Sequence, residues 1–86
     1  MTENEQIHAA YLEAERLRTD PALANALISL RRDALEQLAQ IDATETDKIR
    51  DAQASVRAID GLTTHIAHAI LRWKALPPDQ RAEITG

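Results

Sequence analysis

The sequence predicts an all-α protein whose main feature is a long antiparallel helical hairpin. Three observations lead to this prediction. Apolar residues recur at spacings of three and four along most of the 86 residues, as one face of a helix requires. Only two glycines and three prolines interrupt that pattern. In the last long segment the apolar residues repeat every seven positions, which is typical of coiled-coil packing.

The first helix is predicted over about residues 3–18. Its apolar face consists of Ile7, Ala10, Ala14 and Leu17. Acidic residues begin this segment and arginines end it, which complements the helix dipole. Asp20 and Pro21 separate it from the next helix, because the residue before a proline avoids helical geometry and proline is favoured at the first position of a helix.

The second helix, predicted over about residues 21–41, is the first arm of the hairpin, and Asp20 can cap it. Its apolar stripe consists of Leu23, Leu27, Leu30, Ala34, Leu38 and Ile41, with Ile28 and Leu35 beside it. The connection at residues 42–44 is short enough to force antiparallel packing. We expect Thr44 to cap the next helix, because the acidic residue Asp47 follows three positions later.

The third helix, predicted over about residues 45–76, is the second arm and the longest element. Two heptad tracks alternate along it, namely Ile49, Val56, Thr63 and Ile70, and Ala52, Ile59, Ile66 and Trp73. Two prolines at 77 and 78 end the helix. We therefore expect a single helical domain over residues 1–76. A short C-terminal tail over residues 77–86 follows, which could form one helical turn.

The short connection also predicts how the two arms face each other. Residue i of the second helix should lie opposite residue 86 − i of the third, so that coverage ends near His65. The apolar stretch that begins at Ile66 is then covered either by the first helix or by another subunit. Gly61 falls opposite alanines in this register, so a close backbone approach of the two helices is one explanation for a glycine there. The alternative is an exposed glycine that only lowers helix propensity.

Composition limits the function classes. The chain has no cysteine, which excludes disulfides, thiolate catalysis and cysteine-based zinc sites. Its formal net charge of −4 comes without the basic stripe typical of nucleic-acid binding. No apolar stretch approaches the roughly 20 residues of a membrane span, and the polar N-terminus does not resemble a signal peptide. We therefore expect no nucleic acid and no membrane as partner, and a cytoplasmic location.

No group of residues predicts catalysis. Carboxylate pairs such as Glu13 and Glu15 have no enclosed apolar pocket for acid–base work, and no Ser-His-acid group or glycine-rich phosphate loop is present. His65 and His68 are three residues apart, whereas helical zinc sites place two histidines four apart with a nearby glutamate. We expect a non-enzymatic protein without catalytic, cofactor-binding or metal-binding residues and without a cofactor.

The apolar inventory is small for a helical domain. Sixteen residues are alanine, phenylalanine is absent, and tryptophan and tyrosine occur once each, so association with another chain is expected to stabilise the fold. Trp73 lies between two basic residues, a combination common at interfaces; the alternative is that it caps the protein's own core against the first helix. The candidate interface residues are Ile49, Val56, Ile59, Ile66, Ile70, Trp73 and Leu76.

Several short sequence motifs between residues 14 and 71 resemble those of a known group of proteins. They read Ala-Glu-Arg-Leu at 14–17, Thr-Asp-Pro-Ala-Leu at 19–23, Ala-Leu-Ile-Ser-Leu-Arg-Arg-Asp-Ala-Leu-Glu at 26–36 and Ile-Arg-Asp-Ala-Gln-Ala at 49–54. This pattern resembles small helical-hairpin proteins encoded among the head and packaging genes of tailed bacteriophages and prophages. The resemblance implies a virion or assembly context. It implies no settled activity and no functional residues.

On these grounds we expect a phage structural or assembly protein. Its helices would contact further copies of itself, or a capsid, portal or connector component, in the host cytoplasm during assembly or in the virion. One alternative is a small phage inhibitor that binds a host defence protein or enzyme, which the acidic first half of the chain would suit. A further alternative is a DNA-packaging factor of the small-terminase type, although no basic recognition helix is visible.

Overall fold

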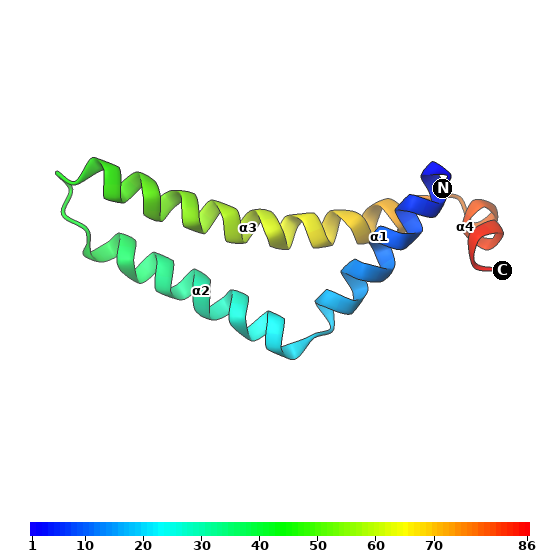
Figure 1. Ribbon diagram of the computed structural model, residues 1–86, viewed down its shortest axis with the longest axis horizontal. Coiled ribbons are helices and arrows are strands. Elements are labelled where there is room, and N and C mark those ends of the chain that lie inside the picture. The colour runs from blue at the N-terminus through cyan, green and yellow to red at the C-terminus, as the bar shows by residue number, and fades with distance from the viewer. The chain divides into compact units, whose positions relative to one another are not determined.

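All 86 residues are described by the computed structural model, and they form helices without any strand (Figure 1). The helices are α1 (Glu3–Arg18), α2 (Pro21–Gln40), α3 (Thr46–Lys74) and α4 (Pro78–Thr85). The all-α class, the N-terminal helix and the two long arms of the hairpin are thereby confirmed.

The start of α1 is set by a capping box. The hydroxyl oxygen of Thr2 accepts a hydrogen bond from the backbone N–H of Glu5 at 3.1 Å. In return, the Glu5 carboxylate accepts one from the Thr2 N–H at 3.3 Å. At the other end, Arg18 pairs with Glu15 one turn earlier at 2.8 Å. The acidic first turn was predicted from the sequence, whereas the capping role of Thr2 was not.

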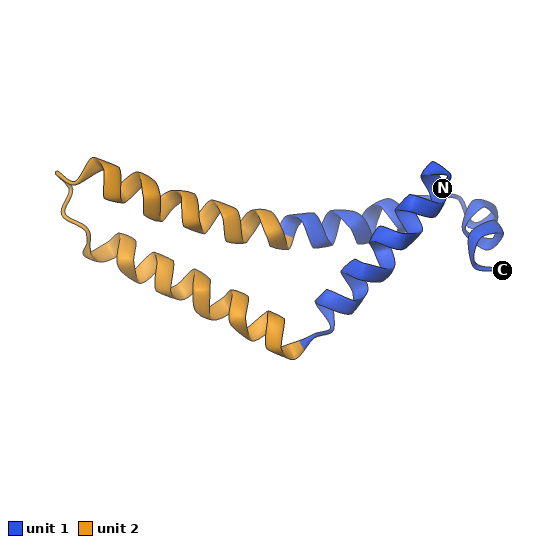
Figure 2. Cartoon of the chain, in the orientation of Figure 1, with its two compact units in different colours: residues 1–20, 64–86 blue, residues 21–63 orange.

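The helices gather into two compact units (Figure 2). Unit 1 consists of residues 1–20 and 64–86, and unit 2 consists of residues 21–63. Unit 1 therefore contains α1, the C-terminal part of α3 and α4, whereas unit 2 contains α2 and the N-terminal part of α3. The C-terminal residues, which we expected to form a tail outside the domain, belong to unit 1.

Unit 1 has a small apolar core between α1 and the C-terminal part of α3. Ala14 of α1 is buried together with Ile66 and Ile70 of α3, and Leu17 and Ala69 pack against them. Both α1 residues belong to the apolar face that helical spacing predicted. The C-terminal end of α3 was predicted to be covered by either the first helix or another subunit, and the structure shows the first helix there.

The C-terminal segment is more helical than the single turn that its sequence suggested. Pro77, with φ −56° and ψ 146°, precedes the eight residues of α4, and Pro78 occupies the first turn, where its missing N–H costs nothing. The helix packs on α1, and the Asn4 side-chain amide donates a hydrogen bond to the side-chain oxygen of Gln80 at 3.0 Å. This contact explains the helix, because eight residues are too few to stay helical alone.

Residues 41–45 join α2 to α3 within unit 2. The carboxylate of Asp42 accepts hydrogen bonds from the backbone N–H of Thr44 at 2.9 Å and from its hydroxyl at 2.7 Å. These two bonds close a local turn and hold the pKa of the Asp42 carboxyl below its usual value. Because α3 begins at Thr46 and the Thr44 side chain is bound to Asp42, the prediction that Thr44 caps this helix is wrong.

The pairing of α2 with α3 is shifted from the predicted register. Arg31 of α2 pairs with Asp60 of α3 at 2.8 Å, whereas the predicted register placed Ser55 opposite Arg31. Leu35 and Val56 line one shallow depression in the same shifted register. The predicted register is therefore wrong by about one helical turn. The connection is longer than predicted by one residue at each end, which alone leaves the facing pairs unchanged, so side-chain contacts between the two helices set the register.

Unit 2 buries little of its apolar surface. Ala34 and Ala52 are its only buried residues, and larger residues such as Leu38 and Val56 are half-buried. A Cβ atom added at Gly61 would meet no atom within 4 Å. Of the two alternatives for Gly61, the structure shows the exposed glycine.

Candidate interaction surfaces

The residues predicted as an interface lie in two different environments. Three of them, Ile66, Ile70 and Trp73, are buried within unit 1. The other four are half-buried, and these are Ile49, Val56, Ile59 and Leu76. The heptad face of α3 is thus not one continuous free surface. Its C-terminal part lies in the protein's own core and is closed to another chain while α1 is docked.

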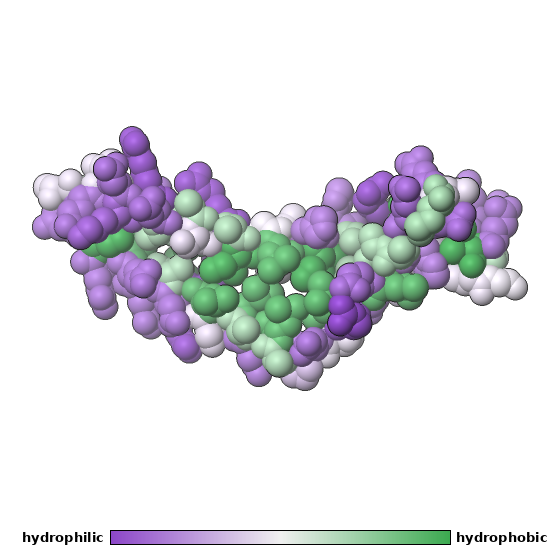
Figure 3. Space-filling model, in the orientation of Figure 1, coloured by the Kyte–Doolittle hydropathy of each residue, from purple (hydrophilic) through white to green (hydrophobic).

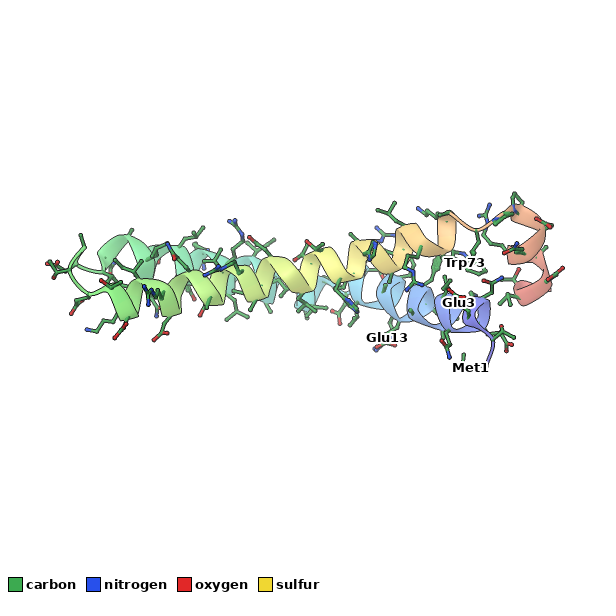
Figure 4. The ribbon with its side chains drawn as sticks, turned by 90° about the horizontal axis from the view of Figure 1, so that it is seen from above. Met1, Glu3, Glu13 and Trp73 are labelled. Atoms are coloured by element: carbon green, nitrogen blue, oxygen red, sulfur yellow. The ribbon has the colours of Figure 1, made fainter.

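Trp73 closes the end of that core against α1 (Figure 4). Its side chain is 7% exposed. The His8 ring lies 4.6 Å from the Trp73 ring, centroid to centroid, at a tilt of 38°. The Tyr11 ring lies 5.7 Å away and is close to parallel, at 18°. These separations are favourable for aromatic pairs. Of the two roles considered for Trp73, the structure has the core cap.

His8 and Tyr11 are the residues of this contact that the sequence analysis missed. They are three positions apart, so they share one side of α1. They also lie directly beside the predicted apolar face, which contains Ile7 and Ala14. The signal for an aromatic contact with the single tryptophan was therefore present, but spacing alone could not name the partner helix.

His65 and His68 are both exposed on α3. Together with Ile7, Ala10 and Arg72 they line a shallow depression of unit 1, and its lining includes no carboxylate. No cluster of three or more His, Cys, Asp or Glu side chains is placed to hold a metal ion. The lining has no Ser, Thr, Tyr or carboxylate side chain beside the two imidazoles.

A free apolar surface lies on α2 in unit 2. Ile28 is 65% exposed and Leu35 is 39% exposed, and their spacing of seven residues places both on one side of the helix. An open groove there is lined only by α2 residues, namely Ile28, Arg31, Arg32, Leu35, Glu36 and Ala39. We call these residues the outer face of α2. Figure 3 shows further hydrophobic residues open to solvent over unit 2.

The charges of the outer face differ in how far they are paired. The guanidinium of Arg31 donates a hydrogen bond to Asp60, which holds the pKa of the Asp60 carboxyl below its usual value. Arg32 reaches only the adjacent Asp33, at 3.8 Å. Glu36 makes no ion pair within 4 Å. This face therefore combines exposed apolar side chains with charges that the chain itself leaves largely unused.

None of the helices is both long enough and apolar enough to span a membrane. Comparison with protein-family models, with curated proteins and with solved structures finds no match for this chain.

Proposed function

We propose that this protein acts by binding other protein chains through its helices, without catalysing a reaction, and that it serves the structure or assembly of a tailed-phage particle. The observation that carries the first part is the poor coverage of unit 2. Its buried residues are two alanines, whereas Ile28, Leu30 and Leu62 are exposed.

Unit 2 gains little stability from its own side chains. Ordering a residue costs roughly 1.5 kcal/mol of conformational entropy. Burial returns roughly 25 cal/mol per Å² of apolar surface, and an alanine side chain has little surface to bury. A partner that covers the exposed leucines and isoleucine would supply the missing burial. This balance supports a protein that is completed by contact with another chain.

The phage context has a separate basis, the resemblance of residues 14–71 to small helical-hairpin proteins of phage head and packaging regions. A helical adaptor that contacts copies of itself, or a capsid, portal or connector component, suits both the resemblance and the uncovered α2. The two parts of the proposal are independent, because protein binding by unit 2 does not require a phage.

Amide hydrogen exchange on the intact chain tests the first part. In dilute solution we expect the amides of residues 21–40 and 46–63 to exchange much faster than those of residues 64–74, because few side chains cover unit 2. Adding the partner, or raising the protein concentration if the chain binds itself, should slow exchange in unit 2. A monomer whose unit 2 is already as protected as unit 1 would contradict the proposal.

The second part is tested in the phage or prophage that encodes the chain. We expect deletion of the gene to reduce the yield of complete particles, and complementation with the intact gene to restore it. Mass spectrometry of purified particles then shows whether the protein remains in the virion. Normal assembly without the gene, together with particles that lack the protein, would contradict a structural or assembly role.

A further inference from the structure

The outer face of α2 carries its charges in a fixed order along an apolar stripe. Ile28 and Leu35 form the stripe, and Arg32 and Glu36 flank it on one side, with the base nearer the N-terminus. Within one helix, a base four residues before an acid is the less favourable order for a pair. Consistent with this, Arg32 pairs weakly with Asp33 and leaves Glu36 without a partner.

The charges of two α2 helices are complementary only when the two helices run antiparallel. If a second α2 lies antiparallel across the stripe, Arg32 of each copy faces Glu36 of the other copy. A parallel two-fold arrangement would instead place Arg32 of each copy opposite Arg31 of the other copy, on the other flank of the stripe, where like charges repel. A two-fold axis generates the antiparallel arrangement, and two-fold dimers are the commonest assemblies of identical chains.

We propose that a second copy of this chain docks antiparallel on the outer face of α2, an inference that rests on the proposed protein-binding function. The axis lies at the level of residue 34, midway between Arg32 and Glu36, on the side of α2 opposite the buried Ala34 side chain. Leu35 then packs beside Leu35 of the second copy near the axis. At each end, the large side chain of Ile28 lies over the small Ala39 of the other copy, a combination of large and small residues that interdigitates well.

The inner side of α2 remains free to contact α3 in this arrangement. Arg31 keeps its ion pair with Asp60, which lies on the opposite flank of the stripe from Arg32 and Glu36. The proposed dimer thus adds contacts to unit 2 without removing any that the single chain makes. It uses a surface different from the heptad face of α3.

Charge-reversal variants test this arrangement, and the measured quantity is the mass of the protein in solution. Light scattering of the intact protein over a concentration series is expected to give about twice the chain mass of 9.6 kDa. Arg32→Glu and Glu36→Arg each replace two attractive contacts with two repulsive ones. Each single variant should weaken the dimer by about tenfold or more in Kd, since ~1.4 kcal/mol corresponds to tenfold.

Two combinations separate charge pairing from damage to the fold. The double variant Arg32→Glu, Glu36→Arg restores both attractive contacts and should return to the dimer mass. A mixture of the two single variants should form a heterodimer, because the two acids of one chain then face the two bases of the other. Arg50→Glu, an exposed charge reversal on α3 away from this face, should leave the mass unchanged.

A matched pair of alanine variants tests the apolar stripe. Ile28→Ala should weaken the dimer by about tenfold, since a buried isoleucine loses more than ~1.4 kcal/mol when truncated. Leu30→Ala removes a side chain of similar exposure, 55%, that points to another side of α2, and it should leave the dimer intact.

The outcomes distinguish this proposal from the broader function. A dimer that survives Arg32→Glu, or single variants that do not recover on mixing, would overturn docking on α2 while leaving protein binding intact. A monomer at all concentrations would also overturn it and would assign the surface to a different protein. The broader function fails only if unit 2 of that monomer is as protected from amide exchange as unit 1.

Discussion

The two compact units contain the same kind of helix but bury very different amounts of side chain. Unit 1 buries Ile66, Ile70 and Trp73 between its helices. Unit 2, a segment of the same length, buries only Ala34 and Ala52 and exposes Ile28 and Leu35. Unit 1 can therefore be held together from within, whereas unit 2 depends on helix propensity and on whatever covers it.

This difference shows that helical periodicity and core formation are separate properties of a sequence. Apolar residues recur at helical spacing in both units. Unit 1 contains the only tryptophan and the only tyrosine, which fill the space between α1 and α3. Unit 2 has no aromatic residue, and its two buried residues are alanines, which favour a helix without providing volume. A pair of regular helices with so little buried side chain is what we expect where another chain supplies the missing contacts.

Removal of Trp73 should cause the largest loss of stability and should affect unit 1. Trp73→Ala is expected to lower the free energy of unfolding by about 3–5 kcal/mol, because it removes a buried ring from the core of unit 1. Circular dichroism during urea unfolding measures the loss. Leu71→Ala, a truncation two positions away at an exposed residue, should change it by about 0.5 kcal/mol or less. Equal losses would mean that α1 does not dock where the structure places it.

A change at Gly61 should stabilise unit 2 and leave unit 1 as it is. Gly61→Ala is expected to stabilise α3 by about 1 kcal/mol, because alanine favours the helix and its Cβ meets no atom within 4 Å. Slower amide exchange at residues 46–63 would report the gain. Ala58→Gly, the reverse change at an exposed position of the same helix, should cost about as much. Destabilisation by Gly61→Ala would indicate a close helix contact at this position.

The N-terminal cap of α1 offers a smaller test in unit 1. Thr2→Ala removes the hydroxyl that accepts the Glu5 N–H and should cost about 1 kcal/mol. Thermal unfolding followed by circular dichroism measures the loss. Thr44→Ala is the matched control, since its hydroxyl binds the exposed Asp42 and caps no helix. We expect it to cost clearly less, and an equal cost would restore the capping role that the sequence suggested for Thr44.

The helices themselves were predictable because their signals are local. Spacing of apolar residues, the dipole-matched charges of α1 and the break at Pro21 depend only on neighbours in the chain. The longer C-terminal helix was missed because its stability comes from a contact with α1 through Asn4 and Gln80, which are distant in sequence. The register of α2 against α3 was wrong because it is set by side-chain contacts between the two helices, such as that of Arg31 with Asp60, and not by the connection alone.

The candidate interface was predictable only in part, for a related reason. The heptad repeat of α3 identifies an apolar face, but it does not say which part of that face the same chain covers. Ile66, Ile70 and Trp73 were predicted as interface residues and lie in the core of unit 1. Ile28 and Leu35 were placed beside the stripe of α2 and lie on its exposed outer face. Which apolar face stays free is a property of tertiary packing.

The smallest expected effect concerns the ion pair that joins the two helices of unit 2. The Arg31 guanidinium lowers the pKa of the Asp60 carboxyl from its ordinary value of 3.8. A carboxyl with a lowered pKa stabilises the folded state fully above that ordinary value and loses this contribution as the pH falls through its folded pKa. Asp60→Asn should therefore be slightly less stable than the wild type at pH 7 and equal to it in strong acid.

A double-mutant cycle then decides whether this contribution comes from the contact with α2. Arg31→Gln should remove the same pH-dependent part, and adding Asp60→Asn to it should remove nothing more. Both partners are about half exposed, so the coupling is expected to be weak and to fall further at high salt. Purely additive effects would separate Arg31 from Asp60. The predicted register, with Ser55 opposite Arg31, would then again be the better description of unit 2.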